Sequence, residues 1–122
     1  MAKGIDRKSN PVLVGLIGDL KNAGRENEAP IWRDIALRLE KPSRNWAQVN
    51  VSKLEAYLRD GENAVVPGKL LGAGDLTKPV TVIAYNASSS AKAKIAAAGG
   101  KVLTMQEGVA AFPKGEKCRI LG

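Results

Sequence analysis

Apolar residues recur at helical spacing through the first forty residues of the chain. Asn10 is a favoured helix cap, and apolar residues follow it at intervals of three and four as far as Gly24, a favoured helix stop. This spacing predicts an amphipathic helix. A second stripe begins at Pro30 and must end before Pro42, because proline cannot continue a helix. The two stripes predict a helical hairpin over residues 10–41.

The pattern then changes to short apolar runs separated by turn residues. Residues 63–68 (NAVVPG) predict a brief strand, and residues 79–85 (PVTVIAY) predict a longer strand that is buried on both faces. Residues 88–100 predict a helix that starts with serine caps, and residues 101–105 predict another strand. This strand, helix and strand indicate a parallel crossover. A last strand is predicted at residues 118–121.

The segments between these elements are less regular. Residues 41–50 (KPSRNWAQVN) are interpreted as irregular. Ser52 and Glu55 have the spacing of a capping box, and Gly61 follows as a stop, so a short third helix is predicted between them. The tail after Thr104 is expected to form one helical turn. The pattern as a whole predicts a mixed α/β fold of the α+β type, with a βαβ crossover in its strand-rich part.

Composition limits the classes of protein that fit this pattern. A chain of 122 residues with 44% hydrophobic residues is expected to form one domain over residues 1–122, with a helical part at 10–41 and a basic α/β core at 42–122. No signal peptide and no apolar run of about 20 residues are recognised, so export and a membrane partner are not expected. One cysteine and no histidine exclude an internal disulfide and disfavour a zinc site, which fits the cytoplasm.

The charge of the chain points to a polyanionic partner. The formal net charge is +7, and the excess is concentrated after residue 40: residues 1–40 carry seven basic and six acidic side chains, whereas residues 41–122 carry twelve and six. Only 4% of the residues are aromatic, which disfavours a protein that stacks successive bases of a single strand.

A glycine-rich segment at residues 65–82 resembles a phosphate-binding loop, but it fails both nucleotide motifs. A P-loop would need a glycine where Asn63 stands and a serine or threonine where Leu70 stands. A dinucleotide fingerprint that starts at Gly72 would need a third glycine where Thr77 stands. A nucleotide-dependent enzyme is therefore disfavoured, and no cofactor or small-molecule substrate is predicted.

Catalytic chemistry has no better support elsewhere in the chain. Without histidine, a general base at neutral pH would need a carboxylate or lysine with a strongly displaced pKa. Asp60 and Glu62 fit a solvated turn, the serines at 88–90 fit helix caps, and Cys118 fits a buried structural thiol. We predict no catalytic and no metal-binding residue.

The remaining feature is a set of cations on irregular or edge segments. Spread in this way, they suit separate phosphates of a nucleic-acid backbone better than one small ligand. Arg44, Lys53 and Lys69 stand out because each lies next to a cap or a glycine turn. The full set is Lys41, Arg44, Lys53, Lys69, Lys78, Lys92, Lys94, Lys101, Lys114, Lys117 and Arg119.

Several stretches of the chain are similar to one protein family. "APIWRDIA", "VNVSKL", "VVPGKLLGAG" and "PKGEKCRIL" resemble the archaeal eighteen-e form of the large ribosomal subunit proteins related to bacterial protein fifteen, and the resemblance runs from Asn10 to Gly122. It implies a structural component of the large subunit with no catalytic activity, which binds large-subunit rRNA and touches neighbouring ribosomal proteins. It also implies an irregular, superhelical core of the β-β-α type.

The resemblance also implies positions of RNA contact. The "VNVSK" block places Asn50, Ser52 and Lys53 at a helix start near RNA, and the "VPGK" block places Gly68 and Lys69 in a central turn. The segment "KPSRNWAQVN" departs from the family pattern, in which a denser run of arginines is expected. The RNA-binding residues predicted in all are Arg44, Asn50, Ser52, Lys53, Gly68, Lys69, Gly72, Gly74, Lys78, Lys92, Lys94, Lys117 and Arg119.

Two questions stay open at the level of sequence. The alternative to RNA binding is a protein-interaction module in which the N-terminal helices dock another protein and the positive charge maintains solubility. Trp46 has two interpretations as well: it stacks on an exposed base or ribose, or it fills the seam between the helical hairpin and the rest of the chain.

Overall fold

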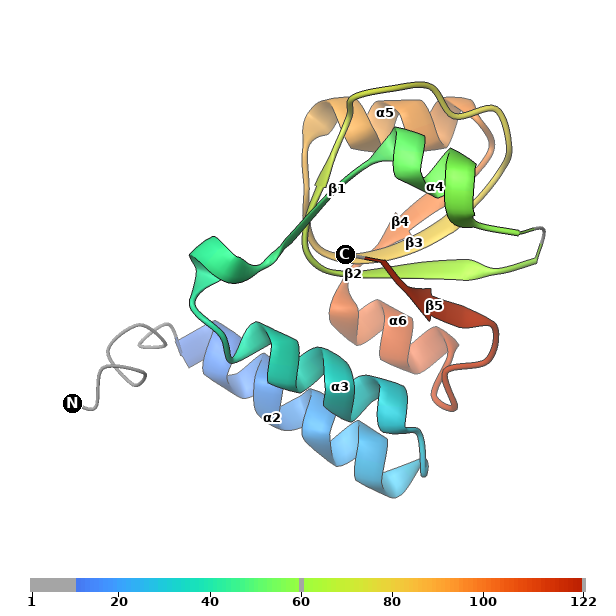
Figure 1. Ribbon diagram of the computed structural model, residues 1–122. Helices are drawn as coiled ribbons and strands as arrows, with labels where there is room; N and C mark the ends of the chain where they lie inside the picture. The colour runs from blue at the N-terminus through green and yellow to red at the C-terminus, as the bar shows by residue number, and fades with distance from the viewer. Residues whose placement is uncertain (1–10, 60, 122) are drawn as a thin grey trace.

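The computed structural model describes residues 11–59 and 61–121, and it has three layers (Figure 1). Helices α4 and α5 cover one face of a central sheet, and α2, α3 and α6 lie on the other side. The mixed α/β fold with an N-terminal helical hairpin is confirmed. In chain order the elements are α2 (Pro11–Glu26), α3 (Pro30–Leu39), η1 (Ser43–Asn45), β1 (Ala47–Asn50), α4 (Val51–Tyr57), β2 (Asn63–Leu71), β3 (Thr81–Ala87), α5 (Ser89–Ala97), β4 (Lys101–Leu103), α6 (Met105–Ala111) and β5 (Cys118–Ile120).

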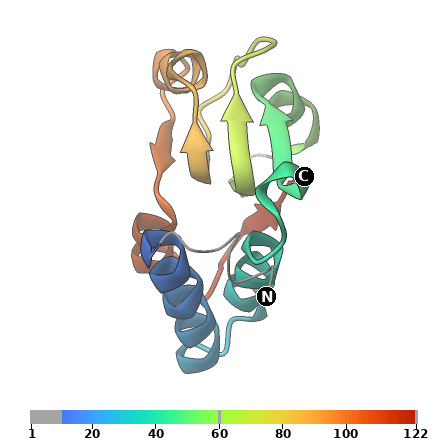
Figure 2. The same cartoon turned by 90° about the vertical axis from the view of Figure 1, so that its left-hand side faces the viewer.

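All strand pairs of the sheet are parallel, in the order β1-β2-β3-β4, as Figure 2 shows. β2 is the longest strand and has different neighbours along one edge: β5 pairs with residues 63–65, and β1 pairs with residues 68–71. The predicted crossover from β3 through α5 to β4 is confirmed as parallel. Helices on both faces explain why β2 and β3 read as nearly continuous apolar runs.

Two apolar cores lie on opposite faces of the sheet. The first holds the inner face of the hairpin against the sheet, with Trp32 and Ile35 packed in one cluster with Ile83. The second lies beneath α4 and α5, where Leu54 and Ile95 share a cluster with Val66 of β2 and Val82 of β3. The hairpin is thus packed on the sheet through its apolar stripe, as its helical periodicity predicts.

The hairpin departs from prediction at its turn. α2 continues to Glu26 instead of ending at Gly24. A Cβ on Gly24 would lie 3.1 Å from both the Ala29 oxygen and the Arg33 nitrogen, so this glycine permits close packing of the two helices instead of ending the first one. The predicted cap at Asn10 lies outside the described residues.

Predictions of local structure were also wrong for β2, for β1 and for the tail of the chain. The brief strand predicted at 63–68 extends to Leu71, so Lys69 is also part of the strand and the turn expected at Gly68 and Lys69 is not formed. The segment expected to be irregular contains β1, whose register with β2 was invisible in a four-residue run. The tail forms the two-turn helix α6 instead of one turn, and Thr104 and Glu107 make a capping box at its start.

Candidate nucleic-acid interface

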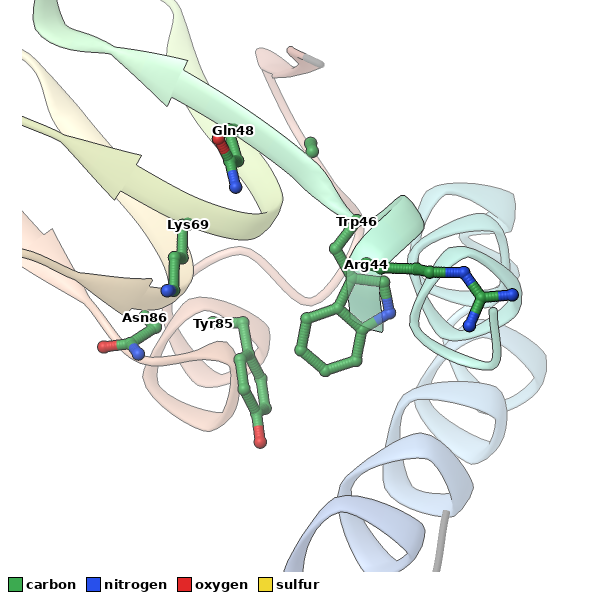
Figure 3. Close-up of a pocket in the computed structure, with 7 residues that line it drawn as sticks. Arg44, Trp46, Gln48, Lys69, Tyr85 and Asn86 are labelled. Atoms are coloured by element: carbon green, nitrogen blue, oxygen red, sulfur yellow. The ribbon is translucent and has the colours of Figure 1, made fainter. Parts of the chain in front are cut away.

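A row of three polar side chains crosses three neighbouring strands of the sheet. Gln48 of β1 is in register with Lys69 of β2, and Lys69 is in register with Asn86 of β3. All three residues are exposed, and their side chains make no hydrogen bond to the part of the chain that the structure describes. We call Gln48, Lys69 and Asn86 the polar row, which Figure 3 shows in this order across the sheet.

The polar row depends on an irregularity in β2. Val66 of β2 pairs with Ala84 of β3, and Lys69 pairs with Asn86. β2 thus advances by three residues where β3 advances by two, so β2 contains one extra residue. Pro67 lies at this point and has no N–H to donate to a neighbouring strand, which fits a bulge. Gly68 lies there too, against Ala47 of β1. The bulge therefore determines which side chain of β2 faces Gln48 and Asn86.

An aromatic hollow of about 320 Å³ lies beside the polar row. Its lining includes the three residues of the row, and we define it by the full set: Arg44, Trp46, Ala47, Gln48, Lys69, Tyr85 and Asn86. The rings of Trp46 and Tyr85 meet edge to face with centroids 4.9 Å apart. The Trp46 indole N–H donates to the Lys41 carbonyl at 3.0 Å, which orients the ring. In Figure 3 the Arg44 guanidinium points away from both rings.

The aromatic hollow is part of a longer groove. A second hollow, which Arg38 and Lys41 line, shares Trp46 and Ala47 with it, and a third hollow, which extends to Ser88, shares Lys69 and Asn86. The groove therefore runs from the end of the helical hairpin across the sheet to the start of α5. Its basic side chains give it positive charge along this course.

A second group of predicted site residues meets at the carboxyl edge of the sheet. A Cβ on Gly72 would overlap the Ser90 hydroxyl, and a Cβ on Gly74 would overlap the Cβ of Ser52. Gly74 also has φ +96°, which favours glycine. The Lys94 ammonium donates to the carbonyls of Gly72 and Gly74, each at 2.6 Å. Both glycines therefore pack against the chain's own helices α4 and α5, and their approach to RNA stays a prediction.

The segment after β2 continues over α4 and is held there by polar contacts. The Asn50 side-chain oxygen accepts a hydrogen bond from the Ala73 N–H at 3.2 Å, and the Lys78 ammonium donates to the Leu58 carbonyl. The predicted capping box of α4 was wrong: Asn50 is the cap residue and makes no side-chain cap bond. Glu55 turns to the overlying segment instead, so tertiary contact overrides the local motif.

Glu55 provides a pH-dependent test of this overlying segment. Its carboxylate accepts hydrogen bonds from the N–H and the hydroxyl of Thr77, both at 2.9 Å. These bonds, with a smaller contribution from Lys78, lower the pKa of Glu55 below its ordinary value of 4.5. The pKa of Glu55 is lower in the folded state than in the unfolded state. Its contribution to stability is therefore complete at pH values above the unfolded-state pKa, and it is lost as the pH falls through the folded-state pKa.

We therefore expect Glu55→Ala to lower the free energy of unfolding at neutral pH, and the difference from wild type to shrink as the solution is acidified below 4.5. Urea unfolding at a series of pH values measures this difference. A difference that stays constant across the series would contradict the contribution of the charged carboxylate.

The remaining predicted cations are dispersed. The Lys53 ammonium lies over the Tyr57 ring, 5.9 Å from its centroid. The Arg119 guanidinium lies 3.7 Å from the Glu62 carboxylate, at the amino end of β2. Lys92 on α5 and Lys117 before β5 are exposed, and Lys117 has φ 56°. The fold brings Arg44 and Lys69 to one groove and brings Asn50, Ser52, Gly72, Gly74 and Lys94 to one edge, but Lys117 and Arg119 lie apart from both.

No arrangement for covalent chemistry is found in residues 11–59 and 61–121. Burial, with a smaller effect of Glu116, raises the pKa of the Cys118 thiol, so it stays protonated near neutral pH. The Ser88 hydroxyl caps α5 by accepting from the Ala91 N–H at 3.1 Å, as predicted. Within the same residues no three potential metal ligands gather, and none of the helices is long and apolar enough to span a membrane.

Comparison with known proteins agrees with the resemblance noted in the sequence. Residues 17–103 match the model of a family described as the ribosomal proteins 50S-L15 and 50S-L18e together with a protein of the 60S subunit, and this segment is well over half of the chain. The chain belongs to this family. The family consists of structural components of the ribosome, so the chain is a structural protein of the large ribosomal subunit and not an enzyme.

Individual archaeal members of the family are similar over nearly the whole chain. Large ribosomal subunit protein eL18 of Methanoregula boonei is 51% identical over 114 residues, which are 93% of this chain and 94% of that protein. The protein of the same name in Archaeoglobus fulgidus is 49% identical over 115 residues, 94% and 98% of the two chains. In Halobacterium salinarum the identity is 43% over 114 residues, 93% and 97% of the two chains.

Sequence reasoning about this ribosomal protein missed three side chains of the aromatic hollow. Gln48, Tyr85 and Asn86 were passed over because none of them carries a charge and none belongs to a recognised motif. Gln48 had one usable signal, because it stands between Ala47 and Val49 as the exposed position of an alternating run. Asn86 had none, since its place beside Lys69 depends on the bulge in β2.

Proposed function

We propose that this protein binds folded large-subunit rRNA in the cytoplasm and stabilises it as part of the ribosome. The observation that carries the proposal is the groove across the sheet, where the exposed Lys69 stands between two neutral amides and Arg44 lies at the rim. A surface cation with no partner among the described residues is available to a phosphate. Family membership supports the same partner.

The predicted RNA-binding residues fall into two roles under this proposal. Arg44, Lys69, Lys92 and Lys117 are exposed and supply charge for separate phosphates. The others shape the surface: contacts of Asn50, Lys94 and Lys78 hold the segment after β2 over α4 and α5. The shaping set is completed by Ser52, Lys53, Gly68, Gly72, Gly74 and Arg119.

Recognition of RNA shape suits this arrangement. The major groove of A-form RNA is too deep and narrow for side chains to read, so proteins contact its phosphates and 2′-hydroxyls. Cations spread over β2, α5 and the segment before β5 match a folded backbone better than one extended strand. Neighbouring ribosomal proteins are further proposed partners, at the exposed apolar side chains of Val12 (72% exposed) and Val14 (51% exposed) on the hairpin.

The role of Lys69 is tested by its removal. If about five phosphates are contacted, the logarithm of wild-type affinity for large-subunit rRNA should fall with the logarithm of salt concentration with a slope of about −4. We expect Lys69→Ala to weaken binding at low salt and to make the slope less steep by about 1, since one phosphate contact is lost. Filter binding over a series of salt concentrations measures both quantities.

Lys101→Ala is the matched control, because Lys101 is also an exposed strand lysine but lies on β4, outside the groove. Neither variant should change the unfolding midpoint. A wild-type affinity that does not depend on salt would overturn the electrostatic proposal, and equal effects of the two substitutions would remove the groove from the interface.

A further inference from the structure

We propose that the aromatic hollow takes one unpaired nucleobase of the rRNA, which lies against the rings of Trp46 and Tyr85 and is read along its edge by Gln48 and Asn86. The inference rests on the proposed function and adds base recognition to a surface argued so far from phosphates and shape. Four features of the hollow support it: its rings, its amides, its size and its rigidity.

The chain has few aromatic residues, yet two of them, Trp46 and Tyr85, lie together at the surface of the sheet. Trp32 is fully buried, whereas Trp46 and Tyr85 are only half-buried and line the same hollow. The two rings contact each other edge to face, and both also pack against the apolar core between the hairpin and the sheet. Both interpretations of Trp46 then hold together, because one ring can fill the seam and also line the hollow. Unpaired RNA bases are commonly recognised by stacking on such aromatic side chains.

The polar side chains of the hollow are suited to a base edge. Gln48 and Asn86 are neutral amides, and each offers one acceptor and two donors, the combination that pairs with the edges of bases. A site for phosphate alone would use cations and backbone N–H groups. The two amides flank Lys69 across adjacent strands and have no side-chain hydrogen bond within the described residues. They are therefore available to a ligand.

The size of the hollow limits what can enter it. A volume of about 320 Å³ is at the lower end of the range of roughly 300 to 1,000 Å³ for small-molecule sites, so it admits one planar group and no duplex. The groove on either side is lined by Lys41 and Lys69, which lie where the flanking phosphates of an extruded nucleotide would run. An unpaired nucleotide in a folded rRNA has this combination of base and backbone.

The hollow is also held in a fixed shape. Gln48, Lys69, Tyr85 and Asn86 project from paired strands, and the indole N–H of Trp46 is bonded to a main-chain carbonyl. Side chains on strands are positioned more accurately than those on loops, and little ordering is required when the ligand binds. The base would thus enter a site that already exists in the protein.

Base-specific chemical probing of transcribed large-subunit rRNA, with and without the full-length protein, tests the inference. Wild type is expected to protect at least one unpaired base. In the double variant Gln48→Leu and Asn86→Leu that base is expected to regain its reactivity, while the affinity falls about tenfold, as for loss of one base-edge contact. Trp46→Ala should also restore reactivity, with a loss of similar size from stacking.

Two controls separate base reading from charge and from folding. Gln106→Leu removes an exposed glutamine of α6, outside the hollow, and should leave both protection and affinity at the wild-type level. Lys69→Ala should weaken binding, but at saturating protein it should leave the same base protected. Each variant is compared with wild type by its melting temperature, so that an unfolded variant is recognised.

The outcomes distinguish this inference from the proposed function. If wild type binds the rRNA in a salt-dependent way but the Gln48 and Asn86 double variant protects the same bases with the same affinity, the base site is overturned and the proposed function stands. If wild type does not bind the rRNA at all, both are overturned. Protection that is lost in the double variant and in Trp46→Ala, and kept in both controls, supports the base site.

Discussion

Replacing Trp32 by alanine is expected to lower the free energy of unfolding by about 3 to 5 kcal/mol, the usual cost of removing a large aromatic side chain from a core. Trp32 is 0% exposed and packs in one cluster with Ile35 and Ile83. Its indole N–H donates to the carbonyls of Phe112 and Pro113, at 3.2 and 3.0 Å. Alanine therefore leaves a cavity and also frees the tail that follows α6 from α3.

A loss of this size is a large part of the total stability of a small domain, about 5 to 15 kcal/mol. Urea unfolding measures it. Trp32→Phe is an intermediate case, because it keeps one six-membered ring in the core but loses the N–H and the volume of the five-membered ring; its expected cost is about 1 to 3 kcal/mol. Val14→Ala, at an exposed position of the same hairpin, should change stability by no more than about 0.5 kcal/mol. Equal midpoints for wild type and Trp32→Ala would contradict the packing described.

The second large effect is expected from Gly68→Ala, which should lower the free energy of unfolding by about 3 kcal/mol, near the upper end of the cost of overpacking. Gly68 is paired with Ala47 of β1. A Cβ at this position would overlap the Ala47 carbonyl oxygen and lie 2.9 Å from the Ala47 nitrogen. These atoms are backbone, so the strand must move to accommodate the methyl group. The registers of Gln48 and Lys69 would shift with it, and RNA affinity should fall as well.

The physical reason differs from the one that the sequence suggested. The family resemblance implied that Gly68 lies in a central turn, but it lies in β2 and does not have positive φ. The requirement is space next to β1. Gly18→Ala is the matched control: apart from the adjoining backbone of α2 itself, no atom of the described residues lies within 4 Å of the added methyl, and alanine favours helix by about 0.5 to 1 kcal/mol. If Gly68→Ala and Gly18→Ala both stabilise the protein, the close contact of β1 and β2 is refuted.

Helices were predicted well where periodicity and caps agreed. The stripes that follow Pro11 and Pro30 each extend over several turns, so their apolar faces could be read without knowledge of their partners. Ser88 also capped its helix as expected. The capping box was assigned to the wrong helix, because Ser52 and Glu55 have the right spacing but are drawn into tertiary contacts, and the matching pair before α6 was overlooked.

Strands were predicted less well, for reasons of length and register. The last strand, predicted at 118–121, is present as β5, but β1 was missed; it has only four residues and is stable only because β2 lies beside it. The alternation around Gln48 covers only three residues, which is too short a pattern to predict a strand by itself. The extent of β2 was underestimated for a related reason: Pro67 and Gly68 are turn residues by composition, and only the neighbouring β1 shows that the chain remains extended.

By itself, the sequence determined the mixed α/β class, the helical hairpin, the basic character of the later part of the chain and the family to which it belongs. These properties depend on composition, periodicity and continuous motifs, which are local in the chain. The tertiary structure alone decided that Gln48, Lys69 and Asn86 form one row and that Trp46 meets Tyr85 beside it. Those residues come from three strands and the segment before them, and their proximity depends on sheet order and on a bulge in β2, because strand register is a long-range property that no single segment encodes.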